Sequence, residues 1–251
     1  ATVTLRFSEA VVSFSSAADI TADNGTLAAM SSADNITWTG TFTPTANTED
    51  ASNTLSLATS YTDTAGNAGP AATTENYAVE TLAPTVNSVA ISSASGVQNS
   101  LLNAGDNVSV TATFSESVIV DNASGTPTLT LVVGSDNRTS TYTSGSGSTP
   151  LVFQYTIQAG ETDADGISIE ANTLALNSGT IRDAAGNNAT ITYSSVSANT
   201  SYKVDNTAPS VDNFTLSDTA LKAGDNATVT LRFSEAVVSF SSAADITADN
   251  G

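Results

Sequence analysis

The sequence contains no histidine and no cysteine, and it has only one tryptophan and one methionine in 251 residues. Without histidine or cysteine, a Ser-His-Asp or Cys-His nucleophile, an imidazole or thiolate zinc site and a disulfide framework are all excluded. The paired carboxylates Asp163 and Asp165 could act as acid and base on a sugar, but no aromatic platform accompanies them. We therefore expect no enzymatic activity.

Positive charge is also scarce. Six Lys and Arg residues stand against 25 Asp and Glu, which gives a formal net charge of −19. Nucleic acids and anionic membranes are bound by clustered Lys and Arg, so neither is an expected partner. No apolar run reaches the roughly 18 residues that a membrane-spanning helix needs. Charged residues make up only 12% of the chain, so Ser, Thr, Asn and Gly must cover much of the surface.

Repetition is the most informative feature that the sequence does have. Residues Ala1–Gly25 recur letter for letter as Ala227–Gly251. A weaker internal repeat relates further segments: Ala223–Val238 to Ala104–Ile119, DTAGN at 63–67 to DAAGN at 183–187, and YAVETLAPTV from Tyr77 to YKVDNTAPSV from Tyr202. The sequence is therefore interpreted as a window on a tandem array in which two related domains alternate.

The prolines of the two similar linkers place the domain boundaries. The longer domain is predicted to span residues 84–208. The shorter domain is divided between the two ends of the sequence: residues 209–251 form the N-terminal part of one copy, and residues 1–83 form the C-terminal part of another, without its first strand.

The local pattern predicts β-structure throughout. Short runs of alternating apolar and polar residues are separated by Gly, Asn and Asp turns, and no helical periodicity is sustained. The predicted strands are 36–42, 54–61, 76–79, 108–114, 128–133, 139–143, 151–157, 167–169, 189–193 and 227–233. About seven strands per domain are typical of an immunoglobulin-like sandwich. We thus predict an all-β chain of tandem immunoglobulin-like β-sandwich domains joined end to end, with Phe7, Trp38, Phe42 and Leu57 in a core.

The motifs of the shorter domain resemble a known family. AGDNATVTLRFSEAV, ADITADNGT, TWTGTFTPTAN and YTDTAGNAG resemble the bacterial Ig-like domains repeated in giant secreted adhesins of Gram-negative bacteria. TPTLTL, LVFQYTIQAGETDADGISI and GTIRDAAGN of the longer domain are similar to repeats of very long cell-surface proteins of marine bacteria, including cyanobacteria.

The resemblance implies a structural module of an extracellular adhesin stalk or surface fibre, located at the bacterial cell surface and acting in cell adhesion and biofilms. It also implies that neighbouring copies follow head to tail and that Ca²⁺ stiffens the domain junctions. The alternative is a ligand-binding module in which a loop of the longer domain recognises a glycan. Letter-for-letter repetition favours the stalk, because a receptor-binding tip is usually present once.

The topology of a sandwich tests the calcium idea against the residues. Antiparallel strands bring the Gly-Asp loop to the outgoing end of each domain, and the Phe-Ser-Glu motif and the D-x-A-G-N turn to the incoming end. The expected oxygen ligands are Glu80, Glu116, Asp183 and Asn187 at the first junction, Asp106, Asp205, Asn206 and Glu235 at the second, and Glu9, Asp63, Asn67 and Asp225 at the matching positions of the shorter domain. Ca²⁺ takes 6–8 oxygen ligands of these types.

Each candidate also has a simpler interpretation. The D-x-A-G-N sequence is a good tight turn in its own right, and a lone Glu after a strand is usually solvated. The first linker replaces the Asp and Asn of the second by Glu80 and Thr81, so we expect weaker binding there. The sequence Glu161-Thr-Asp163-Ala-Asp165-Gly resembles half a calcium loop, or alternatively an acidic hairpin turn.

The division of the shorter domain predicts an open edge. Residues 209–226 carry the apolar Val211, Phe214 and Leu216, which residues 1–83 would need to close their sheet. We expect this segment to complete the shorter domain of the next copy rather than to fold back within its own chain. Such head-to-tail contacts do not close and therefore propagate as a filament.

Overall fold

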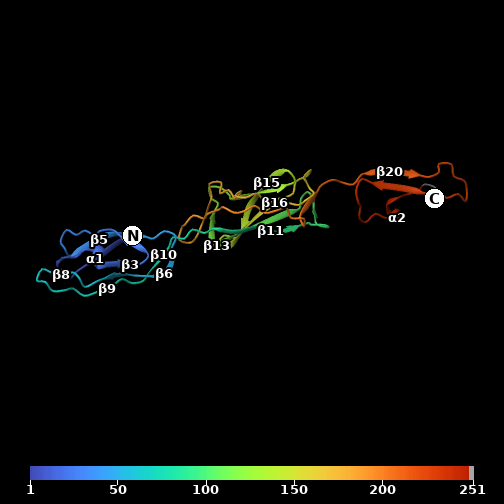
Figure 1. Ribbon diagram of the computed structural model, residues 1–251. Helices are drawn as coiled ribbons and strands as arrows, with labels where there is room; N and C mark the ends of the chain where they lie inside the picture. The colour runs from blue at the N-terminus through green and yellow to red at the C-terminus, as the bar shows by residue number, and fades with distance from the viewer. Residues whose placement is uncertain (249–251) are drawn as a thin grey trace.

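The computed structural model describes residues 1–248 and is all-β apart from two short helices. It is elongated, with residues 1–83, 84–208 and 209–248 following one another in a row (Figure 1). No strand pairing within the described residues joins one of these three segments to another. The all-β, sandwich-type fold predicted from the sequence is confirmed.

The longer domain is built on one large sheet. The strands run in the order β11-β13-β16-β15-β14, and β18 pairs with β13. Their bounds are Val86–Ser95 for β11, Asn107–Asp121 for β13, Thr128–Val133 for β14, Asp136–Ser144 for β15, Ser148–Thr156 for β16 and Thr180–Arg182 for β18. A small sheet contains β12 (Leu101–Leu102), β17 (Thr162–Asp163) and β19 (Lys203–Asp205), in which β12 and β19 run parallel.

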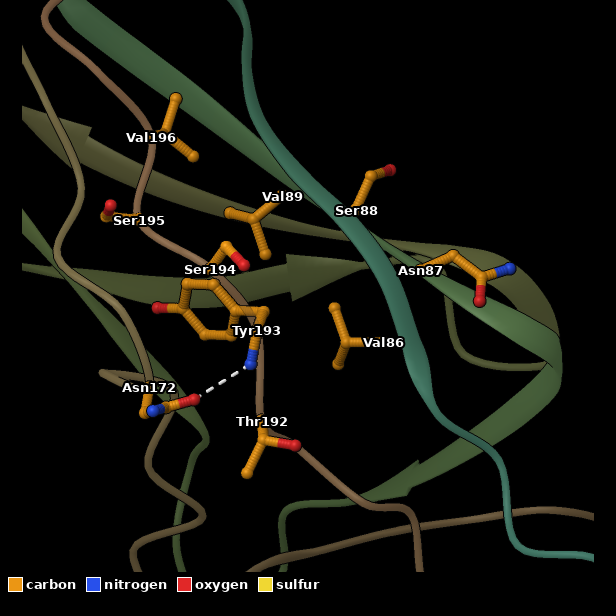
Figure 2. A pocket seen from close by; sticks show the side chains of 10 residues that line it. All are labelled: Val86, Asn87, Ser88, Val89, Asn172, Thr192, Tyr193, Ser194, Ser195 and Val196. Carbon is orange, nitrogen blue, oxygen red and sulfur yellow. Dashed lines mark hydrogen bonds between the residues drawn. The ribbon is translucent and has the colours of Figure 1, made fainter.

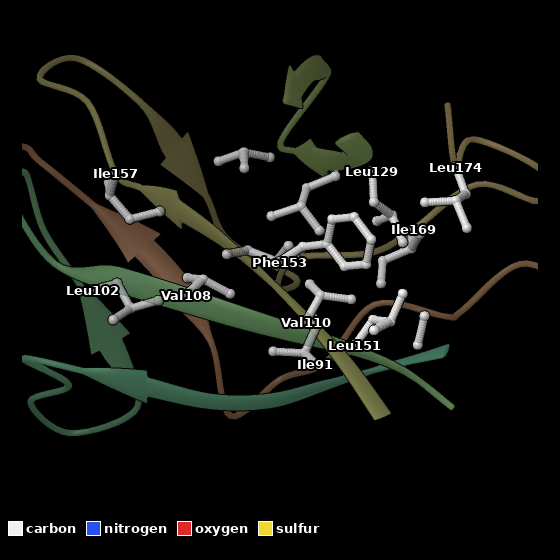
Figure 3. Close-up of a cluster of buried hydrophobic side chains, with 14 of the residues drawn as sticks. Ile91, Leu102, Val108, Val110, Leu129, Leu151, Phe153, Ile157, Ile169 and Leu174 are labelled. Carbon is white, nitrogen blue, oxygen red and sulfur yellow. The ribbon is translucent and has the colours of Figure 1, made fainter. Parts of the chain in front are cut away.

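The core of the longer domain lies along the inward face of β13. Val108, Val110, Ala112 and Phe114 alternate with polar residues and are at most 1% exposed. Phe153 of β16 is fully buried among them and their neighbours (Figure 3). Because side chains on a strand alternate between its two faces, this single pattern fixes which side of the sheet faces the core.

The shorter domain has smaller sheets, in the orders β1-β5-β4, β3-β7-β9, β10-β6 and β2-β8. Their bounds are Thr2–Arg6 for β1, Val11–Val12 for β2, Ile20–Ala22 for β3, Gly25–Leu27 for β4, Thr37–Pro44 for β5, Glu49–Asn53 for β6, Leu55–Leu57 for β7, Thr62–Asp63 for β8, Ala72–Thr73 for β9 and Tyr77–Glu80 for β10; helix α1 covers Ser16–Asp19. Phe42 and Leu57 are buried as predicted. Phe7 and Trp38 are half-buried and pack against the core cluster.

The third segment is a hairpin followed by a helical turn. Strands β20 (Val211–Leu216) and β21 (Val229–Phe233) pair antiparallel, and α2 spans Ser242–Asp245. Every residue of β20 is exposed. Segment 227–248 repeats the first strand and the helical turn of segment 1–22 but has no strands at the places of β2 and β3. In both helical turns an aspartate, Asp19 or Asp245, accepts the backbone N–H four residues before, at 2.7 and 2.8 Å.

Some sequence expectations differ from the structure. Residues 167–169 and 189–193 are not regular strands; their backbones form only isolated bridges, although Ile167 and Ile169 are buried. The strand expected over 54–61 is reduced to β7: the N–H of Ala58 still bonds the carbonyl of Asp19 in register with β3, but Asp19 belongs to helix α1, so the partner strand ends there. The two four-residue helices were not expected, since they are too short to show helical periodicity.

Replacing Phe153 by alanine should destabilise the longer domain by about 3–5 kcal/mol, because it leaves a cavity among fully buried side chains. Chemical denaturation followed by circular dichroism would measure the loss. Trp38 is the one tryptophan of the chain and lies in the shorter domain, so its fluorescence transition should not move. Ile119→Ala, at a side chain 49% exposed, is the control and should change stability by less than about 0.5 kcal/mol.

Candidate functional site

Each linker is hydrogen-bonded to a turn of the domain that precedes it. Thr81 bonds the carbonyls of Thr45 and Thr48 through its hydroxyl, at 2.6 and 3.2 Å. In the second linker, the side-chain amide of Asn206 donates to the carbonyls of Gln158 and Glu161, at 3.1 and 2.8 Å. Different side chains thus make the same contact at equivalent places.

Each linker is also held by the domain that follows. At the first junction, Thr85 and Ser115 exchange two bonds: the Thr85 N–H donates to Ser115 Oγ at 3.0 Å, and the Ser115 N–H donates to the Thr85 carbonyl at 2.8 Å. Ser210 and Ser234 repeat this pair at the second junction, with both distances 2.9 Å. The serine of the Phe-Ser-Glu motif therefore binds the linker, which places the adjacent glutamate beside it.

At the first junction, the D-x-A-G-N turn reaches the linker as predicted. The side-chain amide of Asn187 donates to Asp183 Oδ2 at 2.7 Å and to the backbone carbonyl of Glu80 at 3.3 Å. Asp183 is buried, and burial, the largest influence, opposes its charged form; hydrogen bonds from Asn187, Gly186 and Ala185 together still lower its pKa.

Acidic side chains gather around this linker. Burial raises the pKa of Glu116, and the charges of Asp183, Glu80 and Glu49 raise it further. Glu49 was not predicted: it lies on β6 directly opposite Glu80 on β10, an arrangement in which like charges repel. None of these carboxylates forms an ion pair with Lys or Arg in residues 1–248. The first junction thus carries an acidic cluster drawn from the linker and both domains.

The second junction is built similarly but with fewer charges. Asn206 Oδ1 accepts the N–H of Ala104 at 2.5 Å, which brings the Gly-Asp loop to the linker as predicted. Asp106 accepts the N–H of Asn103, and Asp205 accepts the N–H of Thr207, both at 2.9 Å. Glu235 Oε1 is buried and has no hydrogen-bond partner among residues 1–248. The residue opposite Asp205 in the strand pairing is Thr162, whereas the residue opposite Glu80 at the first junction is Glu49.

These donors are of the right chemical type for Ca²⁺, which takes carboxylate, amide and backbone oxygens. The orphaned oxygen of Glu235 fits the same requirement. Within the part of the chain that is described, however, no three acidic side chains stand close enough together to hold a metal ion. Side chains would have to rotate inward to complete a coordination shell. Glu49 adds a carboxylate to the first junction, where the second has Thr162. The weaker binding expected at the first junction stays a prediction.

In the shorter domain, the equivalents of Glu116, Asp183 and Asn187 lie at the end away from the first linker. Glu9, Asp63 and Asn67 line one open hollow. Asp63 accepts two backbone N–H groups of its own turn, from Ala65 and Asn67, at 2.8 Å. The Asn67 side chain and these turn bonds lower the pKa of Asp63. Asp225 accepts the N–H of Lys222 and lies 3.7 Å from its ammonium group.

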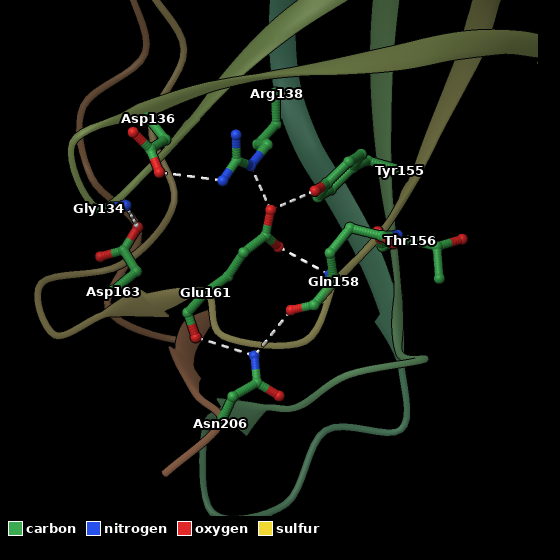
Figure 4. A network of polar contacts seen from close by, with 9 residues as sticks. All are labelled: Gly134, Asp136, Arg138, Tyr155, Thr156, Gln158, Glu161, Asp163 and Asn206. Carbon is green, nitrogen blue, oxygen red and sulfur yellow. Dashed lines mark hydrogen bonds and ion pairs between the residues drawn. The ribbon is translucent and has the colours of Figure 1, made fainter.

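The second candidate, the segment 161–166, is a hydrogen-bonded turn (Figure 4). The carboxylate of Glu161 is buried and accepts bonds from Arg138, the hydroxyl of Tyr155 and the N–H of Gln158. Asp163 accepts the N–H groups of Gly134 and Gly166, at 2.9 and 2.7 Å. Asp165 is exposed. The carboxylates of Glu161 and Asp163 thus have protein partners, which favours the acidic turn over the calcium loop.

The longer domain has a polar groove of about 550 Å³ between the start of β11 and residues 192–196 (Figure 2). Tyr193 is its one aromatic lining residue. The Tyr193 hydroxyl lies 2.7 Å from Thr173 Oγ1, and the backbone N–H of Tyr193 donates to Asn172 Oδ1 at 2.8 Å. The polar groups of Tyr193 are therefore occupied within the domain.

Replacing Glu116 by glutamine should stabilise the longer domain at pH 7 in calcium-free buffer, by up to about 1 kcal/mol. The pKa of Glu116 is raised in the fold, so ionising this carboxyl destabilises the folded state relative to the unfolded state. The advantage of glutamine should therefore fade as the pH falls through that pKa and Glu116 becomes neutral. Urea denaturation at several pH values would measure this. Glu170→Gln, at an exposed acid, is the control; a stabilisation that does not depend on pH would contradict the charge argument.

Comparison with known families gives one match. The family model described as a bacterial Ig-like domain matches residues 1–79 and 205–251, on either side of the longer domain. No curated protein and no solved structure matches the chain. No helix in residues 1–248 is both long and apolar enough to cross a membrane. The matched segments cover half of the sequence and have the β-strand structure described above, so the chain belongs to the family of bacterial Ig-like domains.

Proposed function

We propose that the chain is a structural repeat module of an extracellular adhesin stalk or surface fibre of a bacterium, and that Ca²⁺ bound at the domain junctions stiffens it. Membership of the bacterial Ig-like family supports a surface-protein module. The observation that carries the proposal is the acidic cluster of Glu49, Glu80, Glu116 and Asp183, which surrounds a linker and has no cationic partner in residues 1–248.

The cluster makes the junction sensitive to cations. Carboxylates from the linker and from both flanking domains repel one another most when the domains are aligned, because alignment brings them together. A divalent cation reverses this balance and favours the aligned arrangement. Interfaces between domains of one chain are usually small, and relative motion is then expected unless something restrains it. Calcium would supply that restraint.

The hydrogen bonds of the linker set the geometry on which the cation would act. Thr81 and Asn206 fix each linker to the domain before it, and the pairs Thr85–Ser115 and Ser210–Ser234 fix it to the domain after it. Between these points only a few residues are free to bend. A cation that joins Glu80 to Glu116 would close that remaining hinge.

Removing calcium should shorten and soften the particle. Small-angle scattering of the 251-residue chain should give a smaller maximum dimension in EDTA than in millimolar Ca²⁺, and the melting temperature should also fall, since a ligand that binds only the folded state stabilises it. No change in either quantity on chelation would refute calcium stiffening.

Substitutions at each junction should separate the two sites. Asp205→Ala with Glu235→Ala at the second junction, and Glu80→Gln with Glu116→Gln at the first, should each reduce the change in maximum dimension that calcium causes. Glu75→Gln with Glu170→Gln removes the same amount of charge from exposed sites and should leave the calcium response unchanged. Equal effects of junction and control variants would show that overall charge, not a junction site, governs the shape.

A further inference from the structure

The two edges of the large sheet in the longer domain differ in how they are covered. Strand β14 forms one edge. Beyond it, Thr128 exchanges backbone hydrogen bonds with Ala175, and Val132 exchanges them with Ser168, at 2.8 to 3.1 Å. This edge is therefore occupied by other segments of the same domain.

Strand β11 forms the other edge, which is largely open. The N–H of Val86 donates to the carbonyl of Thr190 at 3.3 Å. Further along, the backbone of residues 87–95 is bonded to β13 and to no other segment of residues 1–248. Described residues precede and follow the longer domain in the chain, so this edge does not arise from an end of the sequence.

The sequence of this edge does little to block a further strand. An exposed edge presents unpaired N–H and C=O groups, and proteins usually protect it with charged residues or proline. Residues 85–105 contain no charged residue and no proline. Ala90 and Ser93 are small and exposed, so a second backbone can approach closely. The register shifts of β11 against β13, after Val86 and after Ile91, bend the edge without covering it.

The absence of charge favours a second copy of the chain as the partner. The segment that meets β11 at Thr190, residues 184–202, also contains no charged residue. Elsewhere the chain carries its net charge of −19, and a strong net charge of one sign keeps molecules apart. Two copies can therefore approach each other most closely where both are neutral. A basic partner would instead be drawn to the acidic groups at the junctions.

The two ends of β11 carry complementary features. At its start lies the polar groove described above, which opens between β11 and residues 192–196 (Figure 2). Val86 and Val89 line this groove and are partly buried against the core. Just beyond the end of β11, Val97 is 37% exposed. When two copies of β11 lie antiparallel, the end of each strand meets the start of the other, so Val97 comes to the groove.

We propose that two copies of the chain bind side by side through β11, with the two strands antiparallel and the sheets continuous across a two-fold axis. Residues 86–89 of each copy then face residues 94–97 of the other, and the axis passes between Ile91 and Ser92. The contact is isologous, because the same surface is used twice, and it closes at two copies for each longer domain. The pairing needs no calcium.

The pairing would add a contact between like molecules to the proposed function. Strand β11 runs along the length of the molecule (Figure 1), so two chains joined in this way run in opposite directions. Chains anchored on one surface run in the same direction, whereas chains from two facing surfaces run in opposite directions. In the proposed stalk, β11 would therefore join facing cells. This consequence rests on the proposed function, whereas the dimer in solution does not.

A single contact of this kind should be weak. Two short strands bury much less than the roughly 1,600 Å² of a standard interface, so pairing in solution needs a high concentration. In a tandem array, equal spacing lets several longer domains pair at once, and linked contacts bind far more tightly than one alone. A weak contact is therefore sufficient to hold two arrays together.

Sedimentation equilibrium of the 251-residue chain in EDTA tests the contact. The mean mass should rise above 25.2 kDa as the concentration increases from micromolar to near-millimolar. Ala90→Asp with Ser93→Asp should weaken this association, because like charges would face each other across the pair. Thr139→Asp with Thr141→Asp is the control, since it adds the same charge to exposed positions of β15, which has partners on both edges. A parent chain that stays monomeric, or equal association of both variants, would overturn the proposal.

Other causes of association can be separated from this contact. End-to-end association, which the sequence predicts, would be common to the parent chain and both variants, so the difference between the variants reports on β11 alone. Far-ultraviolet circular dichroism would show whether each variant keeps its β-structure. Calcium stiffening is measured on the monomer at low concentration, so its failure would leave this result unchanged.

Cross-linking tests the direction and register of the strands, because the natural chain has no cysteine. In the antiparallel register, position 90 of one copy faces position 93 of the other. Ala90→Cys molecules mixed with Ser93→Cys molecules should form disulfide-linked heterodimers under oxidising conditions, and either variant alone should link far less. Thr139→Cys mixed with Ser93→Cys is the control away from the contact. Equal yields in all mixtures would overturn the pairing, and stronger linking of either variant alone would overturn the register.

Discussion

The arrangement of the whole chain depends on how each linker is bonded to the domains on both sides. Thr81 and Asn206 bond the carbonyls of equivalent turns in the domain before each linker. The pairs Thr85–Ser115 and Ser210–Ser234 join each linker to the segment that follows. These contacts join neutral groups, so salt should screen them little. They set the direction in which one domain follows another, and they bring Glu80, Glu116 and Asp183 near the same point.

The distribution of charge follows from this arrangement. Only 12% of the residues are charged. Acidic groups nevertheless lie around the linkers, with few positive groups beside them. Glu161, which is the one acidic residue in 1–248 that is both buried and paired with arginine, lies directly before the second linker. Its carboxylate supports the turn whose carbonyls hold Asn206 (Figure 4). The acids of the chain thus divide into those that build the turns and those that face the hinge.

Much of the architecture could be predicted from the sequence, because the alternation of Val108, Val110, Ala112 and Phe114 fixes a strand with one buried face. The proximity of Asn187 to the first linker followed from strand direction alone. Glu49 could not be found in this way, since its place opposite Glu80 depends on a pairing register between two short strands. An alignment of the TANTED and QAGETD turns would have been the signal. The pairing of Glu161 with Arg138 could not be predicted either, because Arg138 is distant in sequence and no local motif indicates the pair.

The parallel pairing of β12 with β19, and of Thr85 with Thr190, has a mechanical consequence. Tension applied to the two ends of the chain would pull the start of the longer domain one way and its end the other. Parallel segments loaded from opposite ends slide past each other, so their hydrogen bonds are strained together rather than broken one after another. Leu102 and Val204 lie buried at that contact, so water is kept from the bonds under load. The longer domain is thereby suited to transmit force without unravelling.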